Sequence, residues 1–300
     1  MVEEKLKVKK EEAVKLAKES KIDVNTFKAV IEAEVYHSVK PNLDLSSYIK
    51  EGKVDIGVVS DTCFNSKYQR LDLVHTVYRH FQELGVSYVL HCGNIVEKYI
   101  KNRLDVENSI QVDYDAMLSS FEQWMPNIGV KTYFIGGRNE ESYNNKKISS
   151  RDPATGEWNV EEINLIEDLS SYENLEFLGW NNARIKVSDK VTIALASPSS
   201  GSRKPYTISY SMQKLIDSYG GGEKPTIQLL GYYNKRWDSI SKDVFAIMIG
   251  TLQNQIPQQY AKQEPSHTLG GLVLRLNFDK KGNLEKGWNG ITIRDIPFYE

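Results

Sequence analysis

The stretch KVDIGVVSDTCFNSKYQRLDLVHTVYRHFQELGVSYVLHCGNIVE, Lys53 to Glu97, decides the fold. It starts with an apolar run over residues 54–59, which predicts a buried strand, and a second such run covers residues 86–91. Between them lies an amphipathic helix, which Gly85 ends, with helical spacing of Leu71, Val74, His75, Val77, Tyr78 and Phe81. This unit predicts two parallel strands joined by a right-handed crossover.

Both strands of this unit end in short polar loops. Asp61-Thr62-Cys63 follows the first strand, and Gly93-Asn94 follows the second. In open α/β sheets, binding and catalytic sites form at the carboxyl ends of the strands. The two loops are therefore the first candidate site residues.

Three later apolar runs end in the same way. Predicted strands over residues 132–135, 191–195 and 227–230 precede polar or glycine-containing loops. These loops are Gly137-Arg138-Asn139-Glu140, the segment with Ser197, and Gly231-Tyr232-Tyr233-Asn234. Apolar segments that include residues 250–253 and 270–274 close the series.

The order of these strand-end loops resembles that of the calcineurin-like metallophosphoesterases, in particular phage and prokaryotic members of nuclease type. The motifs of that family read Asp-x-His, Gly-Asp, Gly-Asn-His-Asp/Glu, a single His, and Gly-His-x-His. The resemblance runs in order from about Val54 to Leu276. It implies an α/β fold of the α+β sandwich kind, with two sheets flanked by helices over residues 53–300.

The resemblance also implies which residues stand at the family's two-metal site. Those positions hold Asp61, Cys63, Asn94, Arg138, Ser197, Tyr232 and Asn234, and the family's general-acid His is Asn139. Only Asp61 keeps the family's residue. The family would use two divalent metals such as Mn²⁺; here we expect no cofactor, no metal ligand and no catalytic residue.

Two of these replacements explain that expectation physically. Two divalent cations about 3.5–4 Å apart need a bridging carboxylate and several anionic or imidazole ligands. Asn94 is a neutral and weak bridge. Arg138 places a permanent positive charge near the site, because a guanidinium group does not lose its proton in proteins.

Three cations near the predicted site are candidates for binding a phosphate group. Arg138 is one, and Arg203 and Lys204 lie in a loop that the resemblance places facing the substrate. Ordinary surface charge is the competing interpretation for all three. The glycines at 220–222 are not a phosphate loop, because they precede a strand and lack the GxxxxGK[ST] pattern.

The N-terminal 45 residues predict a separate helical appendage. Residues 9–34 read as two helices with a tight turn, and their apolar spacing resembles a helix-turn-helix. In that interpretation Asn25, Thr26 and Lys28 would contact DNA. Lys21 stands where the motif usually has Gly, and a helical hairpin that packs on the main domain or on a partner is the alternative.

The rest of the chain predicts further helices, strands and one long polar loop. Residues 98–127 have a helical pattern, and residues 141–161 read as a polar loop that is either an interaction segment or a plain surface loop. Residues 163–172 and 209–216 predict helices. Strands are expected at 175–178, 182–187, 244–253, 270–278 and 290–297.

Composition places bounds on the function. The chain has 300 residues and a formal net charge of −2, which argues against non-specific nucleic-acid binding by overall charge. Two cysteines make no disulfide framework and are expected to be reduced. Without an apolar run of membrane-spanning length or a signal-peptide core, the prediction is a cytoplasmic protein, in the host cytoplasm if it is viral.

Three functions remain open at this point. The first is an inactive metallophosphoesterase-like pseudoenzyme that binds, scaffolds or regulates a protein partner or a nucleic acid. The second is a phosphodiesterase or nuclease with an altered single-metal site, with ligands Asp61, Cys63, Asn94 and Glu140, in which the thiolate would favour zinc. The third is a helix-turn-helix DNA-binding regulator. The oligomeric state is not predicted.

Overall fold

The computed structural model describes residues 42–151, 158–199, 207–220 and 222–298. The chain divides into two compact units, residues 1–40 and 41–300. The predicted N-terminal helices, with Asn25, Thr26 and Lys28, lie outside the described residues, and so do Arg203 and Lys204. All of the described helices and strands belong to the second unit.

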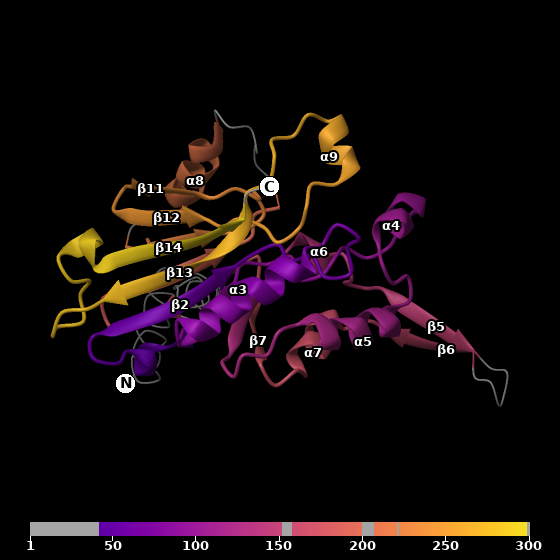
Figure 1. Cartoon of the computed structure of the whole chain (residues 1–300), viewed down its shortest axis with the longest axis horizontal. Helices are drawn as coiled ribbons and strands as arrows, with labels where there is room; N and C mark the ends of the chain where they lie inside the picture. The colour runs from indigo at the N-terminus through magenta and orange to yellow at the C-terminus, as the bar shows by residue number, and fades with distance from the viewer. Residues whose placement is uncertain (1–41, 152–157, 200–206, 221, 299–300) are drawn as a thin grey trace, which may run out of the picture. The chain divides into compact units, whose positions relative to one another are not determined.

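Two mixed six-stranded sheets form the frame of this unit (Figure 1). One sheet has the order β14-β13-β2-β3-β4-β7, and the other has the order β1-β8-β9-β10-β12-β11. The strands of the first are β2 (Lys53–Val59), β3 (Tyr88–His91), β4 (Thr132–Gly136), β7 (Leu175–Trp180), β13 (Leu269–Asn277) and β14 (Ile291–Phe298). Those of the second are β1 (Leu43–Asp44), β8 (Asn182–Lys186), β9 (Thr192–Ala196), β10 (Ile227–Leu230), β11 (Trp237–Ser241) and β12 (Val244–Met248).

The core residues show four layers, helix, sheet, sheet and helix. Ile56 and Val58 of β2 belong to the same buried cluster as Ile227 and Leu229 of β10, so the two sheets meet face to face. The outer face of the first sheet packs against α3 (Leu71–Glu83), α5 (Tyr114–Trp124) and α7 (Leu165–Ser170). The outer face of the second packs against α8 (Ile208–Asp217). The predicted two-sheet α/β sandwich is confirmed.

The opening strand–helix–strand unit is as predicted. β2 and β3 pair in parallel, and α3 joins them. The helix buries Leu73, Val74, Val77, Tyr78 and Phe81, whereas His75 is exposed. Gly57 makes room for this helix, because a Cβ there would lie 2.8 Å from the Phe81 ring. Gly85 follows the helix with a left-handed φ of 65°, which favours glycine.

Two sequence predictions were wrong. Residues 98–127 are not one helical stretch: α4 (Arg103–Asn108) and α5 are separated by a non-helical segment in which Val112 is 62% exposed. Asn102 and Asp113 each cap the following helix through a side-chain oxygen, which fixes two helix starts. Residues 141–161 are not a plain loop. They contain an antiparallel hairpin, β5 (Lys147–Arg151) with β6 (Trp158–Glu162), which extends from the rest of the unit (Figure 1).

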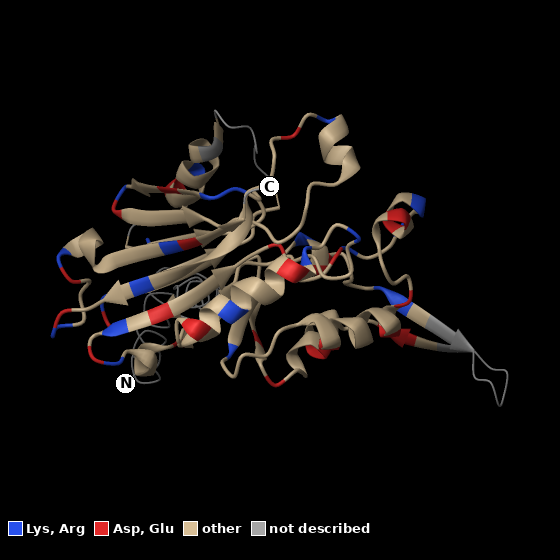
Figure 2. Ribbon diagram, in the orientation of Figure 1, with Lys and Arg blue, Asp and Glu red and all other residues tan. Residues whose placement is uncertain are grey.

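Short elements that the sequence did not predict lie around the sandwich. They are β1, η1 (Ser46–Tyr48), α6 (Arg138–Glu141), β11, α9 (Pro257–Ala261) and η3 (Gly287–Gly290). Basic and acidic residues are interspersed over the strands and helices (Figure 2). No helix among the described residues is long and apolar enough to cross a membrane.

Candidate functional site

Strand ends from both sheets meet at one place and form the candidate site. The loops after β2, β3 and β4 come from the first sheet, and the loop after β10 comes from the second. They hold Asp61, Asn94, α6 and Tyr232 together by direct hydrogen bonds. The fold therefore brings together most of the positions that the sequence singled out.

Asp61 is the central residue of this site. It is 4% exposed, and its Oδ1 accepts a hydrogen bond of 2.8 Å from Nδ2 of Asn94. Its Oδ2 accepts from Ser60 Oγ at 2.6 Å and from the backbone N–H of Tyr232 at 2.9 Å. Hydrogen bonds to an ionised carboxylate are roughly twice as strong as neutral ones. Both carboxylate oxygens thus serve to join β2, β3 and β10.

Asn94 links Asp61 to the loop after β4. Its Nδ2 donates to Asp61, and its Oδ1 accepts from the backbone N–H of Asn139 at 3.1 Å. An aspartate at this position would face Asp61 as a like charge and would need a cation between the two. The amide removes that repulsion and replaces it with a hydrogen bond.

Glu140 links the loops after β3 and β4 from inside the protein. Its side chain is 0% exposed, and it accepts from the backbone N–H groups of Gly137 at 2.7 Å, Asn94 at 3.0 Å and Val96 at 3.0 Å. Burial raises the pKa of Glu140 to about 7, while these backbone donors act in the opposite direction. Glu140 supports the site and does not face the cleft.

Five non-glycine residues at the strand ends have left-handed backbones. Their φ angles are 50° for Asp61, 45° for Cys63, 56° for Asn94, 74° for Tyr232 and 57° for Asn234. A positive φ is uncommon for such residues, and strained backbones cluster at functional sites.

The remaining predicted positions differ in their exposure and partners. Asn139 Nδ2 donates to the carbonyl of Val96 at 2.9 Å and lies 3.7 Å from Cys63 Sγ. Ser197 is 0% exposed, and its Oγ has no hydrogen-bond partner among the described residues. Arg138 is exposed at the start of α6. Cys63 and Cys92 are both buried, and no disulfide joins them.

His267 contacts Asn234 and so belongs to the site, although the sequence did not place it there. The Nδ2 of Asn234 lies 3.2 Å from Nε2 of His267, and Nδ1 of His267 lies 3.0 Å from the carbonyl of Gln253. A carbonyl only accepts, so His267 carries its proton on Nδ1, and Nε2 accepts from Asn234. The Oδ1 of Asn234 is then buried without a partner among the described residues.

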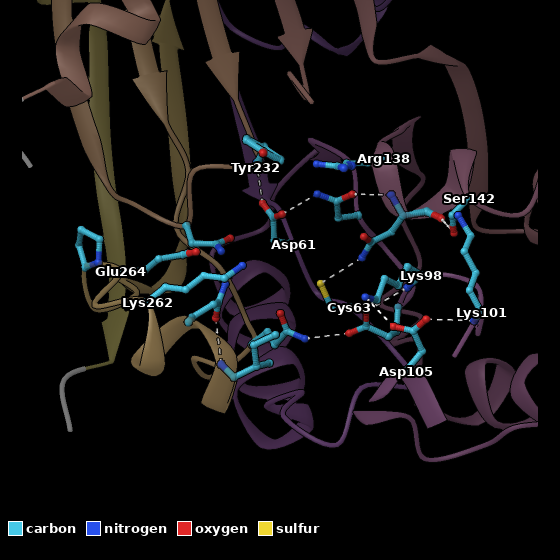
Figure 3. A pocket seen from close by; sticks show the side chains of 18 of the residues that line it. Asp61, Cys63, Lys98, Lys101, Asp105, Arg138, Ser142, Tyr232, Lys262 and Glu264 are labelled. Atoms are coloured by element: carbon cyan, nitrogen blue, oxygen red, sulfur yellow. Dashed lines mark hydrogen bonds and ion pairs between the residues drawn. The ribbon is translucent and has the colours of Figure 1, made fainter. Parts of the chain in front are cut away.

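The site opens into a cleft of about 760 Å³ (Figure 3). Its floor contains Asp61, Cys63, Asn94, Asn139, Tyr232 and Asn234, and Arg138 lines it from α6. Ser142, residues 97–105 and residues 253–265 contribute the other side chains. No sequence motif indicated these two loops, whose cleft-lining cations are Lys98, Lys101 and Lys262.

The carboxylates of the cleft have partners inside the protein. Asp105 forms an ion pair with Lys98, with 2.6 Å between Oδ1 and Nζ, and its Oδ2 accepts a hydrogen bond of 3.0 Å from the backbone N–H of Lys101. Burial raises the pKa of Asp105, but these contacts outweigh it and hold the pKa below its usual value. Glu97 accepts from Gln253 Nε2 at 3.1 Å, and burial raises its pKa.

The residues at the strand ends do not fit the family's two-metal centre. Asp61 is the only carboxylate among the seven positions, and its oxygens already accept three hydrogen bonds. The bridging position carries the amide of Asn94, which donates toward Asp61. Over the described part of the chain, no group of three or more His, Cys, Asp or Glu side chains is arranged to hold a metal ion.

Comparison with known proteins gives similarity at the level of structure. No family profile and no curated protein sequence matches the chain. An archaeal phosphodiesterase is 16% identical, with a TM-score of 0.42, over 82% of this chain and 100% of its own. Vacuolar protein sorting 29 from Cryptosporidium parvum is 13% identical, with a TM-score of 0.37, over 83% of this chain and 100% of its own.

These neighbours have the calcineurin-like phosphoesterase fold, the fold that the strand-end motifs predict. Their TM-scores are below 0.5. The two-sheet architecture of this protein therefore rests on its own strand order and core.

One neighbour contradicts our expectation that a protein of this kind binds no cofactor. Wild-type Vps29 from Entamoeba histolytica was solved in complex with Zn²⁺; it is 8% identical, with a TM-score of 0.38, over 82% of this chain and 100% of its own. The expectation was drawn from lost family ligands alone, and loss of a family motif does not determine whether an ion binds. What the donor set excludes here is the two-metal arrangement.

Proposed function

We propose that this protein is a phosphoesterase-fold binding protein whose strand-end cleft holds an anionic ligand without hydrolysing it. In this role it acts as a binding, scaffolding or regulatory subunit. The observation that supports the proposal most directly is the use of Asp61: its carboxylate bonds to Ser60, Asn94 and Tyr232 and holds the loops in place.

Hydrolysis by the family's two-metal route requires groups that these residues do not supply. That route needs a bridging carboxylate between the two ions, and Asn94 stands there as a hydrogen-bond donor. It also needs a proton for the leaving group. Asn139 occupies that position, and a carboxamide has no proton to give near neutral pH; its Nδ2 instead bonds to the carbonyl of Val96.

The carboxylates of the cleft have more hydrogen-bond partners inside the protein than its cations have. Four cations and four carboxylates line it, so its formal charge is balanced. Three of the carboxylates, Asp61, Glu97 and Asp105, are hydrogen-bonded inside the protein.

Three of the cations of the cleft differ from these carboxylates in their contacts. Among the described residues, the side chains of Lys101, Arg138 and Lys262 have neither a hydrogen bond nor an ion pair. A ligand that enters the cleft therefore meets three cationic side chains whose hydrogen-bond donors suit phosphate or carboxylate groups.

Two measurements test the proposal. Purified protein, with Mg²⁺, Mn²⁺ or Zn²⁺ added, is expected to release no product from bis(p-nitrophenyl) phosphate, a phosphodiester. The same protein is expected to bind pyrophosphate in calorimetry, more weakly after Arg138→Gln and unchanged after Arg79→Gln, an exposed arginine on α3 that serves as the matched control. Metal-dependent turnover that Asp61→Ala abolishes would show that the cleft is catalytic.

The other predicted roles belong to the same proposal. A nucleic acid is one kind of anionic ligand, and a protein partner with an acidic segment is another. DNA reading by Asn25, Thr26 and Lys28 stays a prediction from sequence, as do a phage origin and a cytoplasmic location.

A further inference from the structure

Two loops that face each other across the cleft extend the site beyond the strand ends (Figure 3). One contains Lys98, Lys101 and Asp105, and the other contains Lys262 and Glu264. Gln253 joins their bases, because its Nε2 donates to Glu97 Oε2 at 3.1 Å and to Ser66 Oγ at 2.8 Å. The two loops thus have a shared, buried base and separate tips.

The first loop holds Lys101 in a fixed place. The backbone N–H of Lys101 donates to Asp105, which is 3% exposed, and Asn102 caps α4 by accepting from two backbone N–H groups. Lys98 is committed to Asp105 through the 2.6 Å ion pair. Of the two lysines, therefore, only Lys101 has an uncommitted ammonium group within the described part of the chain.

The second loop presents Lys262 in a similar way. Lys262 follows α9, a helix that begins with Pro257 and is capped by Gln259 Oε1, which accepts from the backbone N–H of Ile256 at 2.9 Å. Gln255 Nε2 donates to the carbonyl of Glu264 at 2.8 Å and closes the loop. α9 has no buried residue, and the loop projects away from the sheets (Figure 1).

The size of the cleft indicates how large its ligand is. At about 760 Å³ it lies within the range of roughly 300–1,000 Å³ of pockets that hold drug-sized molecules. A single phosphate group at the strand ends would leave most of this space empty. Lys101 and Lys262 would then line a region with no ligand in it.

We infer that the ligand carries at least two separate anionic groups, one bound beside Arg138 at the strand ends and another bound in the outer part of the cleft, which Lys101 and Lys262 line. The chemical class is a small molecule with a chain of phosphates, either a free oligophosphate or the phosphate chain of a nucleotide. This inference rests on the proposed function of the cleft, and it adds the second anion-binding position.

Calorimetric titrations of the full chain with orthophosphate, pyrophosphate and tripolyphosphate test it. Tripolyphosphate is expected to bind at least tenfold more tightly than orthophosphate. Lys101→Gln and Lys262→Gln are each expected to weaken tripolyphosphate about five- to tenfold and orthophosphate less than twofold, whereas Arg138→Gln weakens both. Lys280→Gln, an exposed lysine outside the cleft, is the matched control and should change neither.

The results separate this inference from the proposed function. Equal affinity for orthophosphate and tripolyphosphate, or a loss with Lys280→Gln as large as with Lys262→Gln, would overturn the second position and leave the binding function intact. Absence of binding for all three anions would overturn the proposed function itself.

A further titration identifies the source of the phosphate chain. Tighter binding of ADP than of pyrophosphate, lost in Tyr232→Leu, would support a nucleotide, because the Tyr232 ring lines the cleft and would stack on a base. Equal binding of the two would support a free oligophosphate. Both results agree with two anion-binding positions.

Discussion

Replacing Asn94 by aspartate tests how the site holds itself together. The substitution introduces the carboxylate that calcineurin-like phosphoesterases have as their metal bridge, and it places that carboxylate against Asp61. The present contact is a hydrogen bond of 2.8 Å from Asn94 Nδ2 to Asp61 Oδ1. In the variant, this bond becomes a contact between two like charges in a buried setting.

The size of the effect follows from two competing costs. Two unit charges 2.8 Å apart repel by about 6 kcal/mol at an effective dielectric constant of about 20. Protonating an aspartate with an ordinary pKa of about 3.9 costs about 4 kcal/mol at pH 7, because each pH unit is 1.36 kcal/mol. Proton uptake is cheaper, so Asn94→Asp should lose about 4 kcal/mol of unfolding free energy at pH 7.

The sign of the pH dependence is opposite to that of an ordinary paired carboxylate. The folded variant has a carboxyl pKa above its unfolded value, so it binds more protons than the unfolded chain above about pH 4. Relative to the wild type, its stability is therefore retained near pH 4 and falls by about 1.4 kcal/mol per unit as the pH rises. At low pH the protonated side chain donates to Asp61 as Asn94 does now.

Urea unfolding of the wild type and the variant between pH 4 and pH 7.5 measures this difference. Asn127→Asp is the matched control, because Asn127 is exposed and its Oδ1 accepts from the backbone N–H of Gly129, a bond that an aspartate can keep. It should change the unfolding free energy by less than about 0.5 kcal/mol. An Asn94→Asp protein as stable as the wild type at pH 7, or a difference that does not vary with pH, would refute the reasoning.

Three further substitutions test other parts of the site, each by urea unfolding. Glu140→Gln should lower the unfolding free energy by about 1–3 kcal/mol, because its new NH₂ group would face a backbone N–H that now donates to the carboxylate. An unchanged stability would contradict this. Burial lowers the pKa of His91 to about 3, so the wild type should lose about 1.4 kcal/mol per pH unit below about pH 6.5 relative to His91→Gln; parallel pH curves would exclude it. Gly231→Ala should cost about 3 kcal/mol, since its Cβ would lie 2.2 Å from the Cys92 carbonyl oxygen, whereas Gly129→Ala, with nothing within 4 Å, should cost about 1 kcal/mol; equal losses would remove the steric explanation.

Local sequence patterns predicted the sandwich because its strands are short apolar runs with polar ends. The β2–α3–β3 unit and β10 agree with prediction to within one or two residues. The patterns failed where a capping side chain determines the residue at which a helix begins. Asn102 and Asp113 cap separate helices within residues 98–127, and apolar spacing alone does not report a break between them.

The strand-end residues of the site were predictable from sequence, but the two loops that line the rest of the cleft were not. Strand-end motifs identified Asp61, Asn94 and Tyr232 in order along the chain. Lys101 and Lys262 belong to no motif, and they line one cleft only because distant loops share a base at Gln253. The capping Gln of α9 was visible in the sequence as part of a polar loop, yet a five-residue helix gives too little periodicity to recognise.

The measurement that tests binding without hydrolysis most directly is ³¹P NMR of tripolyphosphate mixed with the full-length protein in the presence of Mg²⁺ and then Zn²⁺. One spectrum reports both binding, through broadened or shifted resonances, and hydrolysis, through new orthophosphate and pyrophosphate signals. We predict broadened resonances, restored toward those of the free ligand by Arg138→Gln, and no new signals over a day. Sharp, unshifted resonances, or orthophosphate that accumulates with the wild type and not with Asp61→Ala, would contradict the proposed function.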